Sequence, residues 1–303
     1  MNKTLIKYQN GNSVIELFED GTRVITTESD DFEFDTPLNV DIRVNTGCSL
    51  GFNPKTNKTV CSFCHESART DGKECDYEKL KEVLKNLPSG TELAIGGNKL
   101  TEELTKFLVW SKKKGFICNL TVNHLHINLN DFKLKFYLEE GLIKGLGISY
   151  RKDHSINFDD YFMNHPNVVL HVIAGIDEVD DVLDLPFQKI LCLGYKIFGF
   201  GVDFYSEDVR SSLQRWEWFV KKLIDKKNVV SFDNLALEQL RIERFLTKDM
   251  YEVFNQGEHS IYLNAVSGYF APSSRSHDKV NWKTTTIGEY FKLIEQQRKL
   301  VVS

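Results

Sequence analysis

Three cysteines in one polar segment are the residues of this chain with the clearest capacity for chemistry. Cys48 is followed by a gap of twelve residues before Cys61, and two residues separate Cys61 from Cys64. Three thiolates from one loop can hold three irons of a cubane cluster. The fourth iron then stays open to an outside ligand, which a cluster needs in order to do chemistry besides carrying electrons. The sequence therefore predicts a metal site at Cys48, Cys61 and Cys64.

The elements that must position these cysteines alternate between strands and helices from Asn39 onward. Short apolar runs predict strands, and most have the composition of parallel strands buried on both faces. The expected strands are Val40–Asn45, Glu92–Gly96, Ile117–Val122, Gly145–Ser149, Val168–Ala174, Ile190–Tyr195 and Val229–Phe232. Cys48 follows the first strand, at the end where barrel enzymes place their chemistry.

Between the strands, apolar residues recur with helical spacing. One helix begins after Asp76 as N-cap and stops at Pro88, and a second runs from Thr101 to Gly115. A third carries Trp216 and Trp218, which are expected at the margin of its apolar face. Repeated strand–helix alternation implies a parallel sheet with right-handed crossovers. Six or seven such units favour an α/β fold with a partial (β/α)6-type barrel.

The barrel is expected over residues 37–246 and is flanked by two smaller segments. Residues 1–36 are expected to contain a β-hairpin around Glu19-Asp20-Gly21. Residues 247–303 form a C-terminal extension, in which Ser260–Phe270 predicts a further strand and loop.

The cysteine segment, with Phe63 directly before Cys64, resembles the signature of the radical S-adenosylmethionine (SAM) superfamily. The resemblance implies a radical SAM barrel, a [4Fe-4S] cluster on the three cysteines and SAM on the fourth iron. Reductive cleavage of SAM would give a 5′-deoxyadenosyl radical that abstracts hydrogen from a substrate. It also implies that Phe63 lies against adenine. The usual first gap is three residues, and longer gaps occur in some branches, including 7-carboxy-7-deazaguanine synthases.

A second motif carries the same resemblance. Gly96, Gly97 and Asn98 end the second expected strand, where the family has a Gly-Gly-Glu-type motif that binds the SAM amino group. Glycine lets a ligand approach the backbone closely, and the Asn98 oxygen can accept from an ammonium group.

By position at strand ends, other residues are weaker candidates. Asn123, Ser149 and Gly175 are candidates for contact with SAM. Tyr195 and Lys196 end the sixth expected strand. Asp233 and Asn234 end the seventh and are candidates for contact with substrate. Helix capping is an equally good explanation for Asn123 and Ser149, and explains at least one of Asp233 and Asn234.

Several alternatives stay open on the sequence. A structural zinc site would use Cys75 or His65 as a fourth ligand, which would make the chain a non-catalytic zinc-binding protein. Modification of a nucleotide, resembling 7-carboxy-7-deazaguanine synthase, is a second enzymatic alternative. Cys118 and Cys192 lie inside apolar strands and are expected to be buried thiols. His124 and His126 are expected two apart on one face of the third strand.

Composition limits the partners. The net charge is −5, there is no long Lys/Arg run, and no apolar run reaches the length of a membrane span, so duplex DNA and membranes are not expected partners. The N-terminus lacks a signal peptide, which predicts a cytoplasmic protein with reduced thiols. The resemblance implies a flavodoxin- or ferredoxin-type reducing partner and a small-molecule or nucleotide substrate.

Overall fold

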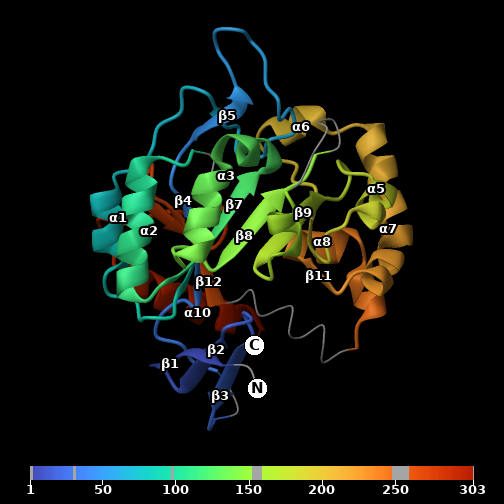
Figure 1. The fold of residues 1–303 in the computed structure, drawn as a ribbon. Helices are drawn as coiled ribbons and strands as arrows, with labels where there is room; N and C mark the ends of the chain where they lie inside the picture. Colours follow the sequence, from blue (N-terminus) through green and yellow to red (C-terminus); the bar gives the residue numbers. More distant parts are fainter. Residues whose placement is uncertain (1–2, 30–31, 97–98, 152–158, 248–258, 303) are drawn as a thin grey trace.

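The protein is a mixed α/β structure built on one large sheet, as the strand–helix alternation predicts (Figure 1). The structure is a computed structural model and describes residues 3–29, 32–96, 99–151, 159–247 and 259–302. The ten strands neighbour one another in the order β11 (Val229–Phe232), β10 (Lys189–Leu193), β9 (Val168–Ile173), β8 (Gly145–Ser149), β7 (Ile117–Asn123), β6 (Glu92–Gly96), β4 (Asn39–Arg43), β12 (Ser260–Asn264), β13 (Tyr269–Ala271) and β14 (Val280–Asn281).

All pairs from β11 to β12 are parallel, and β13 and β14 continue the sheet antiparallel. The seven strands predicted from apolar runs are all present, with ends that differ by at most two residues. The helices are α1 (Tyr77–Leu84), α2 (Glu102–Lys114), α3 (His124–Glu139), α4 (Asp160–Asn164), α5 (Val179–Asp184), α6 (Phe200–Phe204), α7 (Glu207–Lys226), α8 (Asn234–Gln239) and α10 (Ile287–Val302), with a 3-10 turn η1 (Ile242–Phe245).

The helices begin and end where the sequence places their caps. The Asp76 carboxylate accepts from the backbone of Glu78 and Lys79 at the start of α1, and Thr101 accepts from Leu104 at the start of α2. Gly115 ends α2 with a positive φ of 78°, which a residue with a side chain adopts at a cost. No helix in the described part of the chain is both long and apolar enough to cross a membrane.

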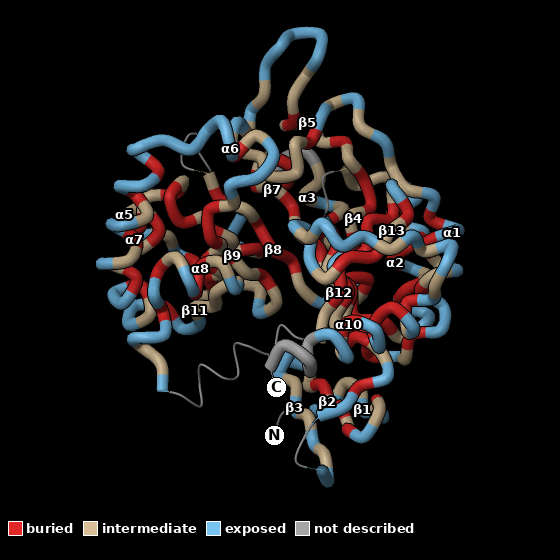
Figure 2. The backbone as a smooth tube through the Cα atoms, turned by 180° about the vertical axis from the view of Figure 1, so that it is seen from behind, coloured by how far each residue is buried: buried red, intermediate tan, exposed pale blue. Residues whose placement is uncertain are grey.

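The two faces of the sheet differ, and the expectation that most strands are buried on both faces is wrong. One face is formed by fully buried residues such as Val40, Leu93, Leu120 and Ile148, which share one core with the apolar sides of the helices. Residues of the other face are only partly buried, because strand burial alternates along β6, β9 and β10. Figure 2 shows buried segments, drawn red, near β7, β8 and β12 in the middle of the molecule and exposed segments, drawn pale blue, around them.

Helix α7 contributes the largest fully buried side chain of the core, Trp216, whose indole nitrogen donates to the carbonyl oxygen of Asp177 at 2.6 Å. Trp216 was expected at the margin of a helix face, and this expectation is wrong. Trp218 is 74% exposed, as expected for a position outside the apolar stripe.

The predicted N-terminal hairpin is the second half of a three-stranded antiparallel sheet. It joins β2 (Ser13–Phe18) to β3 (Arg23–Thr27), and β1 (Thr4–Asn10), which the sequence did not indicate, pairs with β2. An ion pair between Arg23 and Glu92 ties this sheet to β6, and Ile15 enters the main core.

The expected C-terminal extension contributes to the central sheet. Strand β12 pairs with β4 in parallel, with Tyr262 opposite Asp41 and Asn264 opposite Arg43. The predicted strand over Ser260–Phe270 is two strands, β12 and the start of β13, joined by a turn at Gly268. In Figure 1 the arrows of β7 and β8 point toward the end of the molecule where β5 (Gly47–Phe52) lies, and the small N-terminal sheet lies at the opposite end.

Candidate functional site

A cavity of about 390 Å³ opens on the partly buried face of the sheet, near the carboxyl ends of its parallel strands. Strand register brings its lining together: Asp41 lies opposite Ala94 and Tyr262, Gly96 opposite Thr121, and Ser149 opposite Asn123 and His171. The volume lies in the range of small-molecule sites. The three cysteines of the sequence motif also line it, as do Phe63 and residues from β4 to β12.

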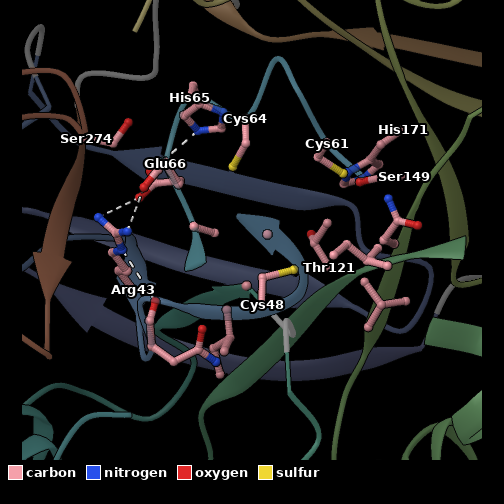
Figure 3. Close-up of a pocket in the computed structure, with 18 of the residues that line it drawn as sticks. Arg43, Cys48, Cys61, Cys64, His65, Glu66, Thr121, Ser149, His171 and Ser274 are labelled. Carbon is pink, nitrogen blue, oxygen red and sulfur yellow. Dashed lines mark hydrogen bonds and ion pairs between the residues drawn. The ribbon is translucent and has the colours of Figure 1, made fainter. Parts of the chain in front are cut away.

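The three cysteines reach the cavity from two segments of one loop. Cys48 lies in β5, and Cys61 and Cys64 lie in the turns that follow the excursion over residues 53–60. In Figure 3 the sulfur atoms of Cys48, Cys61 and Cys64 face a common space from three sides. Within the described residues, no three His, Cys, Asp or Glu side chains converge closely enough to hold one metal ion.

Burial and the nearness of the other cysteines raise the pKa of two of these thiols. Burial raises the pKa of Cys48, and the charge of Cys64 adds to this. Burial also raises the pKa of Cys61 to about 11, with Arg151 opposing the shift and the other two cysteines adding to it. Both thiols are therefore harder to ionise than a free cysteine when no metal is bound.

Phe63 lies between the cavity and α6. The guanidinium of Arg151 lies over its ring, 4.3 Å from the centroid, and the ring of Phe204 meets it edge-on at 5.7 Å. A second hollow on this side is lined by Cys61, Phe63, Arg151 and Asp177, among others. The sequence did not single out Arg151, which follows β8 and also approaches the Asp177 carboxylate at 3.3 Å.

Arg43 of β4 fastens the segment after Cys64 to the sheet. Its guanidinium lies 2.7 Å from a carboxylate oxygen of Glu66 and donates to the Glu66 carbonyl oxygen at 3.0 Å. His65 lies 3.4 Å from the same carboxylate (Figure 3). Burial alone would raise the pKa of Glu66, but the hydrogen bond from His65 and the charge of Arg43 outweigh it and hold the pKa below its usual value.

Two further titratable groups lie on the cavity floor. Solvent reaches the Asp41 side chain through the cavity, but protein atoms surround the carboxyl group and keep much of the water away from it. This desolvation raises the pKa of Asp41, against the opposing effects of Asn39 and Lys196. His171 lies across the sheet from it, and burial lowers its pKa to about 4. The imidazole of His171 is therefore neutral near pH 7.

The expectation that His124 and His126 share one strand face is wrong, because both lie in the first turn of α3. His124 bonds the Ser149 carbonyl oxygen through Nδ1 at 3.0 Å, and His126 bonds the Ser49 hydroxyl through Nε2 at 2.9 Å. Residues two apart on a helix point to different sides. The two histidines therefore serve two different contacts, and only His126 lines the cavity.

Of the residues expected to contact SAM, Phe63, Gly96, Asn123 and Ser149 line the cavity together. Gly97 and Asn98 lie outside the described residues. A Cβ atom added at Gly96 would meet nothing within 4 Å, so this backbone position faces open space. Asn123 is also the N-cap of α3, since its side chain accepts from the backbone of Leu125 at 3.0 Å.

Other candidates have structural contacts in place of the expected site contacts. Gly175 lines the second hollow and adopts a φ of 88°. The Tyr195 hydroxyl is buried and donates to Gly201. Asp233 caps α8 and accepts from the backbone of Gly194 and Ala236, as the capping alternative predicted, and the following Asn234 begins the helix.

The main cavity, as the structure describes it, is not lined by Lys196 or by the other three cysteines. Lys196 is half-buried in a small hollow beside Phe63 and His65. Cys75 packs against the core and does not line the main cavity as described. Cys118 and Cys192 are buried in strands, as predicted.

Sequence reasoning missed several residues that line the cavity: Arg43, Arg151, His171, Tyr262 and Ser274. Counting alternate residues along a strand places His171 and Tyr262 on the cavity face only when the strand register and the pairing of β12 with β4 are already known. For Ser274 no local signal exists, since it reaches the cavity through the loop after β13.

Comparison with known proteins gives no assignment: no protein-family model matches the chain, and no curated protein matches it.

Proposed function

We propose that this protein is a radical SAM enzyme that holds a [4Fe-4S] cluster on Cys48, Cys61 and Cys64. The observation that supports it most strongly is that these cysteines, and no others, bring their thiols to one space at the mouth of the cavity. One sheet face packs against helices and the other lines this cavity, and the proposed partial barrel would need both features.

The residues present fit such a group. A cubane cluster takes one thiolate on each of three irons, so its ligands stand farther apart than the ligands of a single ion. A tetrahedral zinc site, in contrast, draws its thiolates to within about 3.8 Å of one another. The three sulfurs face one space (Figure 3), as a cluster held by three thiolates would require.

When bound and reduced, the cluster would supply the electron that cleaves SAM to a 5′-deoxyadenosyl radical. The chain's own residues would bind and orient SAM. Gly96 leaves room for close approach to its backbone, Phe63 offers an aromatic face, and Asn123 and Ser149 offer polar side chains on the same rim. Arg43 would keep the Cys64 segment in place through Glu66.

Iron analysis after anaerobic reconstitution tests the cluster. We expect about four irons per chain in the native protein. Replacing Cys48, Cys61 or Cys64 with Ala should abolish iron binding. Cys75→Ala is the matched control and should leave the iron content unchanged. One equivalent of zinc in place of iron and sulfide would contradict the proposal.

Formation of 5′-deoxyadenosine from SAM, with dithionite as reductant, tests the activity. Gly96→Val should lower SAM affinity without loss of iron, because the added side chain enters open space that the proposal assigns to SAM. Gly288→Val is the matched control, since a Cβ there also meets nothing within 4 Å but lies in α10. A reduced, intact cluster that never yields 5′-deoxyadenosine would overturn the assignment.

A further inference from the structure

Strand β5, which carries Cys48, belongs to neither sheet of the described chain (Figure 1). Its two ends, Gly47 and Phe52, form isolated bridges with Arg69 of the same loop. The other backbone hydrogen bonds that β5 makes to described residues also stay within this loop. Backbone hydrogen bonds of β5 therefore do not fix Cys48 relative to the central sheet.

One side-chain hydrogen bond joins β5 to a helix of the central fold. The Ser49 hydroxyl lies 2.9 Å from Nε2 of His126 in the first turn of α3. His126 is only 5% exposed, and its carbonyl oxygen accepts from the Asn130 side chain at 2.9 Å. Its Nδ1 is buried and has no hydrogen-bond partner in the part of the chain that the structure describes. Such an atom costs stability, so an apolar side chain would suit this position better if the bond to Ser49 were not needed.

The segment that Ser49 belongs to also directs hydrogen-bond donors at the sulfur of Cys48. Burial raises the pKa of Cys48, and the backbone N–H groups of Leu50 and Gly51 partly oppose this by hydrogen bonding to the sulfur. Hydrogen bonds to the sulfurs are one of the factors that set the reduction potential of an iron–sulfur cluster. Ser49 lies between Cys48 and these two donors in the chain. The bond to His126 therefore bears on where the sulfur lies and on which N–H groups face it.

We propose that His126 is a positioning residue for the metal site, which acts through Ser49 to hold Cys48 where its sulfur can bind one iron of the cluster. The inference rests on the proposed function, since only a group bound by Cys48 needs this sulfur to be held in place. His126 itself is not a ligand in this proposal. Replacing a residue that orients a metal ligand from outside the ligand set typically lowers metal affinity about 10- to 100-fold.

Two properties of the reconstituted cluster test this role without relying on turnover. Ser49→Ala removes the hydroxyl at an exposed position, so the core is not disturbed. Iron release to a chelator should become about tenfold faster in this variant. The midpoint potential should fall, because N–H groups that face the sulfur stabilise the reduced cluster. His126→Leu should have the same two effects, and the double variant should be no worse than either single one, since both changes break one bond.

A conservative variant and a matched control separate this role from a general loss of structure. His126→Gln keeps a polar group that can reach the Ser49 hydroxyl, and it should restore iron release and potential to near the native values. Ser62→Ala is the matched control, because Ser62 is also exposed and lies beside Cys61, but its hydroxyl makes no hydrogen bond to the described residues. It should behave as native protein. If His126→Leu does not fold, Ser49→Ala and His126→Gln decide the outcome.

Amide hydrogen exchange in metal-free protein separates this inference from the proposed function. Exchange over residues 47–52 should rise severalfold in Ser49→Ala and stay native in Ser62→Ala, because the bond to His126 exists without a cluster. Native iron release and potential in Ser49→Ala would overturn the inference, even where exchange rises. Equal losses in His126→Gln and His126→Leu would also overturn it. Native protein that binds no iron, yet shows the expected exchange, would instead contradict the proposed function.

Discussion

His171 is held in a setting that suppresses its charge. It lies on the cavity side of β9, with its ring against the backbone of Gly147 on β8, and burial lowers its pKa from an ordinary 6.5 to about 4. In the unfolded chain the imidazole takes up a proton near pH 6.5, whereas in the folded protein it does so only near pH 4. Between these values the unfolded state binds more protons, so stability falls as the pH falls.

We therefore expect native protein to lose about 2 kcal/mol more unfolding free energy between pH 7 and pH 5 than the variant His171→Gln. Urea denaturation at the two pH values measures this difference. The exposed His277 provides the control, because His277→Gln should keep the native pH dependence. Equal slopes for native protein and His171→Gln would show that the His171 ring is not held neutral.

The imidazole ring of His171 leaves no room for a side chain at Gly147. An added Cβ would lie 2.3 Å from Cε1 of His171, and the φ of Gly147 is not in the left-handed region, so the restriction is one of space alone. Gly147→Ala should cost about 2 kcal/mol of unfolding free energy, and the cost should largely vanish in a His171→Ala background. A double-mutant cycle in urea checks it, with Gly96→Ala as the unhindered control. Additive effects of the two changes would contradict the steric explanation.

At the scale of elements, the junction of β7 and α3 combines a structural and a proposed binding role in one residue. Asn123 ends the strand, caps the helix and lines the cavity. Asn123→Ala should lower the unfolding free energy by about 1 kcal/mol, since the backbone N–H of Leu125 loses its acceptor. Thermal or urea unfolding measures this loss.

Asn123→Ser separates the two roles. Serine keeps an N-cap oxygen but does not reach as far into the cavity, so stability should stay near the native value while SAM affinity falls. Equilibrium binding of SAM to the reconstituted protein measures the second effect. Unchanged affinity in this stable variant would limit Asn123 to capping.

At the scale of the whole molecule, the position of β12 decides whether the C-terminal segment can be separated from the rest. This strand lies between β4 and β13 and contributes the fully buried Leu263 to the core. A chain that ends at Leu246 would leave the β4 edge unpaired next to the cysteine loop. We expect it to show no cooperative unfolding transition by circular dichroism.

A chain that ends at Gln297 is the control for this truncation. It keeps β12 to β14 and most of α10, including the buried Tyr290, Phe291 and Ile294, and should unfold cooperatively with a midpoint near the native one. Native-like unfolding of the shorter chain would mean that residues 247–303 are an independent extension after all.

The sequence alone determined the elements whose signals are local. Strands such as Glu92–Gly96 and Gly145–Ser149 and helices such as α2 follow from apolar periodicity and caps, because those signals act within a few residues. It also located the cysteines on one loop. The cluster and SAM assignments remain proposals that the cavity lining supports.

Tertiary structure decided what depends on distant contacts or on competing local patterns. The run from His124 to Ile127 alternates polar and apolar residues like a strand, yet it starts α3, because Asn123 caps a helix that packs on β7 and β8. Strand β1 has little apolar signal and forms by pairing with β2. The pairing of β12 with β4 joins residues more than 200 positions apart, and periodicity cannot encode a neighbour at that distance. For the same reason only the folded chain brings Tyr262 and Ser274 to the cavity that holds the cysteines.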